Sequence, residues 1–121
     1  MRTMIRSAKD AYDYVSSFGL QEGKESRMIL VYMSHDGSVL GWNERGKNQA
    51  QIKVKDIDDA TSAVIVTNHP SGNCFPDKYD IQETLAIREL LRAKGLGLID
   101  QIIVGYKEFY SYAEEKITFV K

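Results

Sequence analysis

The sequence contains few of the features that mark exported or membrane proteins. It has one cysteine, Cys74, among 121 residues, so the chain cannot form an internal disulfide, as is typical of proteins in a reducing compartment. No apolar run approaches the roughly 20 residues that a membrane-spanning helix needs. The opening residues, MRTMIRSAKD, lack the apolar stretch of a signal peptide. We therefore expect a cytoplasmic protein without membrane contacts.

The chain also lacks a block of charge of one sign. Its 16 basic and 17 acidic residues are mixed along the sequence and give a net charge of −1. Nonspecific binding to nucleic acid depends on a basic surface, so the charge pattern offers no support for a nucleic-acid partner, although a small local basic patch stays open. Four aromatic residues near the end are better explained by strand packing than by base stacking: Tyr106, Phe109, Tyr110 and Tyr112.

The composition is that of one globular domain. Apolar residues make up 43% and charged residues 27%, which are ordinary values for a soluble protein. A chain of this length can bury one core. Because no repeat, low-complexity tract or linker divides it, we expect residues 1–121 to form a single domain.

Apolar spacing predicts two helices. The first covers about residues 8 to 18, after a Ser7 cap. The second follows an Asp77 cap and ends at Gly95. We expect three apolar residues on its core-facing side: Ile81, Leu85 and Leu91.

The remaining apolar segments predict strands. In chain order they are ESRMILVYMS, VLGWNE, QAQIKVKDI, SAVIVTNHP, LIDQIIVGY, KEFYSYA and KITFVK. An Asp-Gly turn makes the first two a hairpin. Helices interspersed among strands predict an α/β fold, with a mixed β-sheet flanked by helices.

The stretch TNHPSGNCFPDKYD, residues 67–80, has the character of a metal site at a strand end. Residues 67 and 69 point to one face of a strand, where two histidines could share an ion, but position 67 is a threonine. Asp80 lies about one turn into the following helix, where the helix dipole favours a carboxylate. Imidazole and carboxylate suit zinc, and a catalytic zinc takes three protein ligands and a water.

Residues 69–80 resemble the signature of the JAB/MPN metalloproteases, and most closely that of the RadC branch. This branch reads H-N-H-P-S-G, a short loop with Pro-Ser, then D-I and a helix. The similarity continues into LIDQIIVG, which matches L-D-H-I-I-V-G, and back to the strand ESRMILVYMS. It implies a JAB/MPN fold, of cytidine-deaminase-like architecture, and zinc-dependent peptidase chemistry. Eight positions are in register without a gap: Asn68, His69, Pro70, Ser71, Gly72, Pro76, Asp80 and Ile81.

The resemblance assigns roles to particular residues. Glu25, which stands before the first strand, would be the general acid and base, although it could equally be a solvated acid. His69 and Asp80 would bind zinc. Thr67 occupies the place of the first metal histidine, and a hydroxyl is a poor zinc ligand beside imidazole.

Two further positions depart from the family pattern. Asp77 stands where the family has a serine that helps to hold the oxygen of the tetrahedral intermediate, and a carboxylate there would repel the developing negative charge. Its use as a helix cap explains Asp77 without a metal. Gln101 replaces a histidine that the RadC branch often has.

Two hypotheses for function stay open. The preferred one is a RadC-type domain with an incomplete zinc site, non-catalytic or weakly active, which binds a protein or peptide partner as a scaffold. The MPN family includes metal-free members of this kind, and exposed strand edges are compatible with a homodimer. The alternative is an active zinc-dependent peptidase or isopeptidase in which Cys74 or water fills the lost ligand position. A role in DNA repair or with mobile elements rests on the RadC label alone.

Overall fold

The computed structural model describes residues 3–120 and contains one six-stranded sheet in the order β2-β1-β3-β4-β5-β6. β3 and β4 are parallel, whereas the other neighbouring strands pair antiparallel, so the predicted α/β fold with a mixed sheet is confirmed. The strands are β1 (Met28–Met33), β2 (Val39–Glu44), β3 (Ser62–Asn68), β4 (Gly97–Val104), β5 (Glu108–Ser111) and β6 (Lys116–Phe119). The helices are α1 (Ala8–Val15) and α2 (Lys78–Ala93), with two short 3₁₀ turns at Ser16–Phe18 and Leu20–Glu22.

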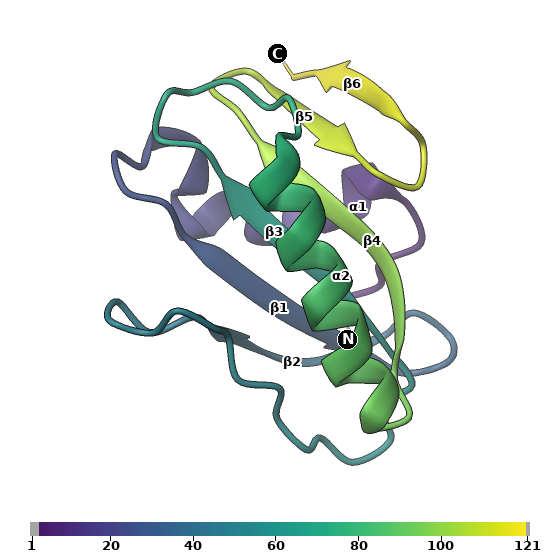
Figure 1. Ribbon diagram of the computed structural model, residues 1–121. Helices are drawn as coiled ribbons and strands as arrows, with labels where there is room; N and C mark the ends of the chain where they lie inside the picture. Colours follow the sequence, from purple (N-terminus) through teal and green to yellow (C-terminus); the bar gives the residue numbers. More distant parts are fainter. Residues whose placement is uncertain (1–2, 121) are drawn as a thin grey trace.

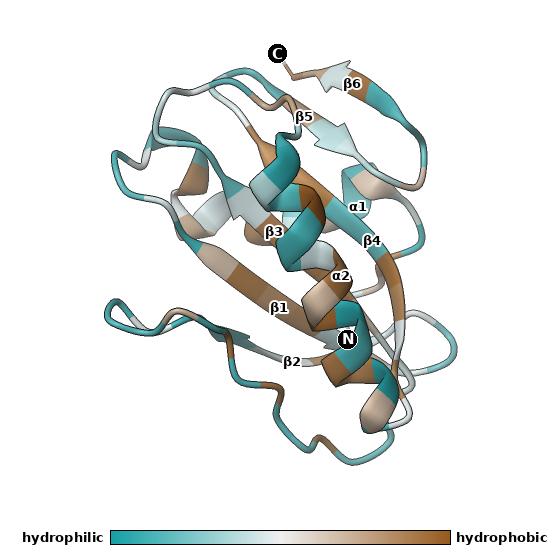
Figure 2. Ribbon diagram, viewed as in Figure 1, coloured by the Kyte–Doolittle hydropathy of each residue, from teal (hydrophilic) through white to brown (hydrophobic). Residues whose placement is uncertain are grey.

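The two helices cover opposite faces of the sheet, with α2 in front of β3 and β4 and α1 behind them (Figure 1). The central strands are the most apolar part of the ribbon, and the loops and the outer side of α2 carry much of the polar surface (Figure 2). Each face of the sheet buries its own cluster of apolar side chains. Neither helix could cross a bilayer, because no helix within residues 3–120 is both long and apolar enough.

The first helix forms as the sequence predicts. The Ser7 hydroxyl accepts a hydrogen bond from the Asp10 backbone N–H at 3.1 Å, which caps the free end of the helix. The last predicted residues tighten into the 3₁₀ turn, a common way for a helix to end. Gly19 then takes a φ of 78°, which a glycine adopts without strain.

The predicted core-facing side of α2 is wrong in part. Ile81 and Leu85 are 48% and 47% exposed, whereas Leu91 is buried as expected. The buried residues of this helix are Asp80, Ile87 and Leu91, which share one face at spacings of seven and four. Asp80 is therefore the first residue of the helix face that packs on the sheet, and its carboxylate points inward.

The predicted strand QAQIKVKDI is also wrong, because residues 45–61 form a connection without a strand. Ile52 and Val54 are nevertheless buried against the α2-side cluster, which explains their alternation with polar residues. Side chains hold the segment in place of a strand ladder. Asn43 donates its side-chain amide to the Lys53 carbonyl at 2.8 Å, and the Tyr32 hydroxyl accepts from the Lys55 N–H at 2.9 Å.

Candidate metal centre

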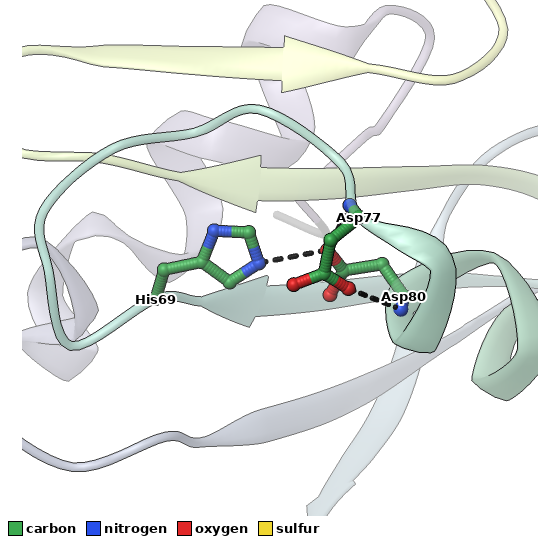
Figure 3. A group of neighbouring side chains, drawn as sticks. All are labelled: His69, Asp77 and Asp80. Atoms are coloured by element: carbon green, nitrogen blue, oxygen red, sulfur yellow. Dashed lines mark hydrogen bonds and ion pairs between the residues drawn. The ribbon is translucent and has the colours of Figure 1, made fainter.

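A cluster of polar side chains lies where β3 leaves the sheet and α2 begins. His69 follows the last residue of β3, and Asp77 caps α2 after the loop 70–76. β3 runs parallel to β4, and the carboxyl ends of parallel strands are a common place for ligand sites. Figure 3 shows the side chains of His69, Asp77 and Asp80 converging at the first turn of α2.

The three side chains are close enough to share one ion. His69 Nε2 lies 2.8 Å from Asp80 Oδ2, so the structure brings together the two predicted ligands (Figure 3). One ligand atom from each of His69, Asp77 and Asp80 can be chosen so that all lie within 4.8 Å of one another. Asp77 is thus also a member of the cluster, although the sequence predicted only a helix cap there and a departure from the family's serine.

Asp77 and Asp80 also form a reciprocal cap at the start of α2. The Asp80 N–H donates to Asp77 Oδ1 at 2.9 Å, and the Asp77 N–H donates to Asp80 Oδ2 at 2.8 Å. This capping box satisfies two backbone donors that a helix start leaves without partners. It also fixes both carboxylates beside the imidazole of His69.

Asn73 orients the imidazole ring from the other side. His69 Nδ1 lies 3.2 Å from Asn73 Oδ1, and the Asn73 amide donates to the Ser71 hydroxyl at 2.8 Å. An acceptor on one ring nitrogen favours a proton there and directs the other nitrogen to its partner, as in many metal-binding histidines. No pattern in the sequence predicted a role for Asn73, because its contact with His69 depends on how the loop folds back.

The electrostatics favour positive charge at this site. Burial lowers the pKa of His69, but hydrogen bonds to Asp80 and Asn73 and the nearby carboxylates outweigh it and leave the pKa raised. The pKa of Asp77 is lowered, first by the Asp80 N–H at the helix start. The site therefore favours either a proton on the imidazole or a cation in its place.

Thr67 lies near the end of β3, two residues before His69. It is 6% exposed, and its hydroxyl accepts a hydrogen bond from the Gln101 side-chain amide at a long 3.4 Å. Ile65, two residues earlier on the same strand, belongs to the cluster under α2. The side chain of residue 67 therefore faces the α2 side, where its hydroxyl contacts Gln101.

Two buried polar atoms near this site have no hydrogen-bond partner among the described residues: Gln101 Oε1 and the Tyr112 hydroxyl. Tyr112 donates its backbone N–H to the Gln101 carbonyl at 3.0 Å, so the two residues lie opposite each other on β4 and the chain after β5. Burial, and then the charge of Asp80, raises the pKa of Tyr112 to about 12. From the sequence, Tyr112 was predicted only to pack within a strand. Its proximity to Asp80 could not be predicted, because it arises from the way α2 lies on the sheet.

Glu25 lies on a separate loop. Its side chain is 70% exposed, and its carboxylate is 4.0 Å from the Lys47 amine. The Asn68 side-chain amide donates to the carbonyls of Leu20 and Glu25 at 3.0 and 3.1 Å, which holds this loop to the end of β3. Glu25 is not a member of the His69–Asp77–Asp80 group, and its role as acid and base stays a prediction.

Cys74 is completely buried and is likewise outside the group of three. Burial, followed by the influence of Glu108, raises the pKa of the thiol to about 11. A metal-binding cysteine acts as a thiolate, which a raised pKa disfavours. The conformation thus gives no support to Cys74 as the replacement ligand.

The site opens to solvent through a shallow cleft of about 480 Å³. Its lining comes from the loop and the helix start: His69, Pro70, Ser71, Asn73, Phe75, Pro76 and Asp77. Phe75 is 60% exposed at this cleft, whereas Asp80 lies beneath it and is 6% exposed. A ligand could therefore approach His69 and Asp77 directly from solvent.

The residues fit a divalent cation through two ligands of the family pattern, His69 and Asp80, and one outside it, Asp77. Zinc binds imidazole nitrogen and carboxylate oxygen, and this chain offers one imidazole and two carboxylates within reach of each other. The second imidazole of the pattern is absent, because Thr67 supplies only a hydroxyl bound to Gln101.

Comparison with known proteins points to one family. A family model described as a RadC-like JAB domain matches residues 5–117. UPF0758 protein SSU98_1084 of Streptococcus suis is 44% identical over 62 residues, which is 51% of this chain and 25% of that protein. A UPF0758 protein of Streptococcus gordonii is 46% identical over 56 residues, 46% of this chain and 25% of that protein. The matched stretch thus spans about a quarter of the length of these relatives.

Proposed function

Because this chain belongs to the RadC-like JAB domain family, we propose that it is a binding member in which hydrolytic chemistry is weak or lost. One observation carries the proposal. The place of the lost metal histidine is filled by Thr67, whose buried hydroxyl is bound to Gln101. A hydroxyl is a poor zinc ligand, and losing a ligand lowers affinity by at least the ~10- to 100-fold seen for outer-shell changes.

The surroundings of the site support the same conclusion. A hydrolase of this kind needs groups that stabilise the negative oxygen of the intermediate, whereas Asp77 places a carboxylate beside His69. A general base must lie within hydrogen-bond reach of the proton it removes. The Glu25 carboxylate is instead exposed and faces Lys47.

The cleft above His69 suits a protein or peptide partner. Two prolines and Phe75 are among its lining residues, and Phe75 is 60% exposed. Tyr106, which is 65% exposed, lies nearby. Tyr106 donates its backbone N–H to the Gly72 carbonyl at 2.9 Å, which places it against the same loop. Exposed aromatic residues are favoured contacts at protein interfaces. A homodimer through the edge strands β2 or β6 is a compatible form of partner binding.

A hydrolysis assay at saturating zinc tests the proposal. Wild-type protein and the repaired variant Thr67→His/Asp77→Ser are incubated with a panel of fluorogenic peptide and isopeptide substrates. Serine keeps a good helix cap at residue 77, so the repaired site should not lose α2. We expect no chelator-sensitive turnover from the wild type.

The alternative, a working zinc-dependent peptidase or isopeptidase, predicts the opposite result. Chelator-sensitive turnover by the wild type that disappears in His69→Ala would overturn the proposal. The His69→Ala variant is the necessary control, because it removes the imidazole and leaves the capping box of α2 in place.

A further inference from the structure

We propose that Asp77 has taken over the position of third ligand, so that His69, Asp77 and Asp80 form a site for one divalent cation. The inference rests on the proposed function, since it concerns the same site, and it adds that this site keeps a metal without hydrolytic chemistry. The family pattern does not supply this ligand, because it has a serine where this chain has Asp77.

The cap of α2 leaves both carboxylates able to bind an ion. A carboxylate has two oxygens and about four acceptor positions, so an oxygen that accepts from the backbone still has a lone pair for a cation. Asp77 uses Oδ1 for the Asp80 N–H, whereas Asp80 Oδ2 accepts from the Asp77 N–H and also faces His69 Nε2. The capping box therefore holds the ligands in advance and reduces the entropy lost on binding.

His69 is prepared for the same role. Its Nδ1 faces Asn73 Oδ1 at 3.2 Å, and its Nε2 points at Asp80 Oδ2 at 2.8 Å (Figure 3). With a proton on Nδ1, the lone pair of Nε2 and the Asp80 carboxylate face each other. Two such acceptors need a positive partner between them, which is either a second proton on the ring or a metal ion.

A second observation, independent of the three ligands, is a buried oxygen on β4 that lacks a hydrogen-bond donor. Gln101 is 1% exposed, and its Oε1 has no hydrogen-bond partner among residues 3–120. Its amide reaches Thr67, two residues before His69 in the chain. A cation with its bound water would satisfy oxygens of this kind.

The ligand atoms of the site determine which metal ion should be used to test it. One nitrogen and two carboxylate oxygens accept several divalent metals, and affinity at such sites rises from manganese to copper along the first transition row and falls again at zinc. The two carboxylate charges match the charge of one divalent ion. Zinc takes imidazole nitrogen and carboxylate oxygen as ligands, so it is the ion with which the site should be tested, at one equivalent per chain.

A zinc titration in competition with a chromophoric chelator gives the affinity without any assay of activity. The test variant is Asp77→Asn, which keeps a good helix cap but removes the carboxylate. The matched control is Asp58→Asn, an exposed acid in the connection between β2 and β3. We expect wild type and Asp58→Asn to bind one zinc equally well, and Asp77→Asn to bind it more weakly by about tenfold or more.

The inference is overturned if wild-type protein binds no zinc in this titration, or if Asp77→Asn binds it as tightly as the wild type. Thermal unfolding of the metal-free proteins shows whether Asp77→Asn is folded, and its midpoint should stay close to that of the wild type. If Asp77 has no effect on zinc while the wild type is inactive, this inference fails and the proposed function stands. If the wild type hydrolyses the substrates and Asp77→Asn binds zinc more weakly, the proposed function fails and this inference stands.

Discussion

The hydroxyl of Thr67 accepts a hydrogen bond from the side-chain amide of Gln101 over 3.4 Å, between the neighbouring strands β3 and β4. Both positions are places where the RadC pattern has a histidine. The two departures from that pattern are therefore in contact and occupy one buried region under α2. The loss of imidazole at one position changes the space and the hydrogen bonding available at the other, so the two should be altered together in any attempt to rebuild the site.

Replacing Thr67 with histidine should raise zinc affinity by about tenfold or more, because it restores an imidazole on the strand face that leads to His69. The measurement is zinc binding in competition with a chromophoric chelator. Since Thr67 is buried and touches Gln101, a larger gain is expected for Thr67→His/Gln101→Ala, which makes room for the ring. Thr61→His, at an exposed position just before β3, is the control.

Unchanged affinity in both the single and the double variant would mean that residue 67 does not face the site. The assignment of its register, and with it the meaning of the threonine, would then be wrong.

Local sequence signals predicted much of the fold. Ser7 and Asp77 cap the two helices through contacts with residues three positions ahead, so the sequence alone contains both partners. Apolar runs predicted β1, β3 and β4 for the same reason, since β1, nearly all of β3 and the last five residues of β4 are buried on both faces. The alternation around Ile52 and Val54 misled the prediction, because a buried loop and a half-exposed strand produce the same pattern.

For the candidate site as well, contacts within a short motif could be predicted, whereas contacts from distant segments could not. The pairing of His69 with Asp80 followed from a motif within twelve residues, and the structure brings the two together. The surroundings of this pair could not be predicted, because they come from distant segments. Tyr112 approaches Asp80 only through the packing of α2 on the sheet, and Gln101 reaches Thr67 across the parallel pair of strands.

The sheet-facing side of α2 can be tested with two adjacent leucines. Leu91 is completely buried, whereas Leu90 is 41% exposed. Leu91→Ala should lower the free energy of unfolding by about 2–5 kcal/mol, because it leaves a cavity in the core. Leu90→Ala should change it by less than about 0.5 kcal/mol. Urea unfolding measures both, and similar losses in the two variants would contradict the helix orientation that turns Asp80 inward.

The ion pair of His69 and Asp80 predicts a pH dependence of stability in the metal-free protein. The pKa of His69 is raised in the folded state above the unfolded value of about 6.5. The contribution of this pair is therefore fully present below that unfolded value and is lost as the pH rises through the folded pKa. Urea unfolding at about pH 6 and about pH 8 should show a fall in stability that is smaller in His69→Gln.

The control for this measurement is His35→Gln, which removes an exposed histidine from the turn between β1 and β2. It should keep the pH dependence of the wild type. If His69→Gln instead retains the full difference between the two pH values, the imidazole does not gain its proton from the contact with Asp80.

Substitution of Cys74 tests whether the third metal ligand is Cys74 or Asp77. Its thiol is completely buried, and burial together with Glu108 raises its pKa to about 11, which disfavours the thiolate that binds metal. Cys74→Ala should therefore leave zinc affinity unchanged in the titration in which Asp77→Asn lowers it, and His69→Ala provides the reference for loss of a ligand. The native thiol should also react slowly with a thiol reagent at neutral pH and quickly once the chain is unfolded. Loss of zinc affinity in Cys74→Ala by about tenfold or more would mean that the loop turns inward when metal binds, and that sulfur replaces the lost imidazole.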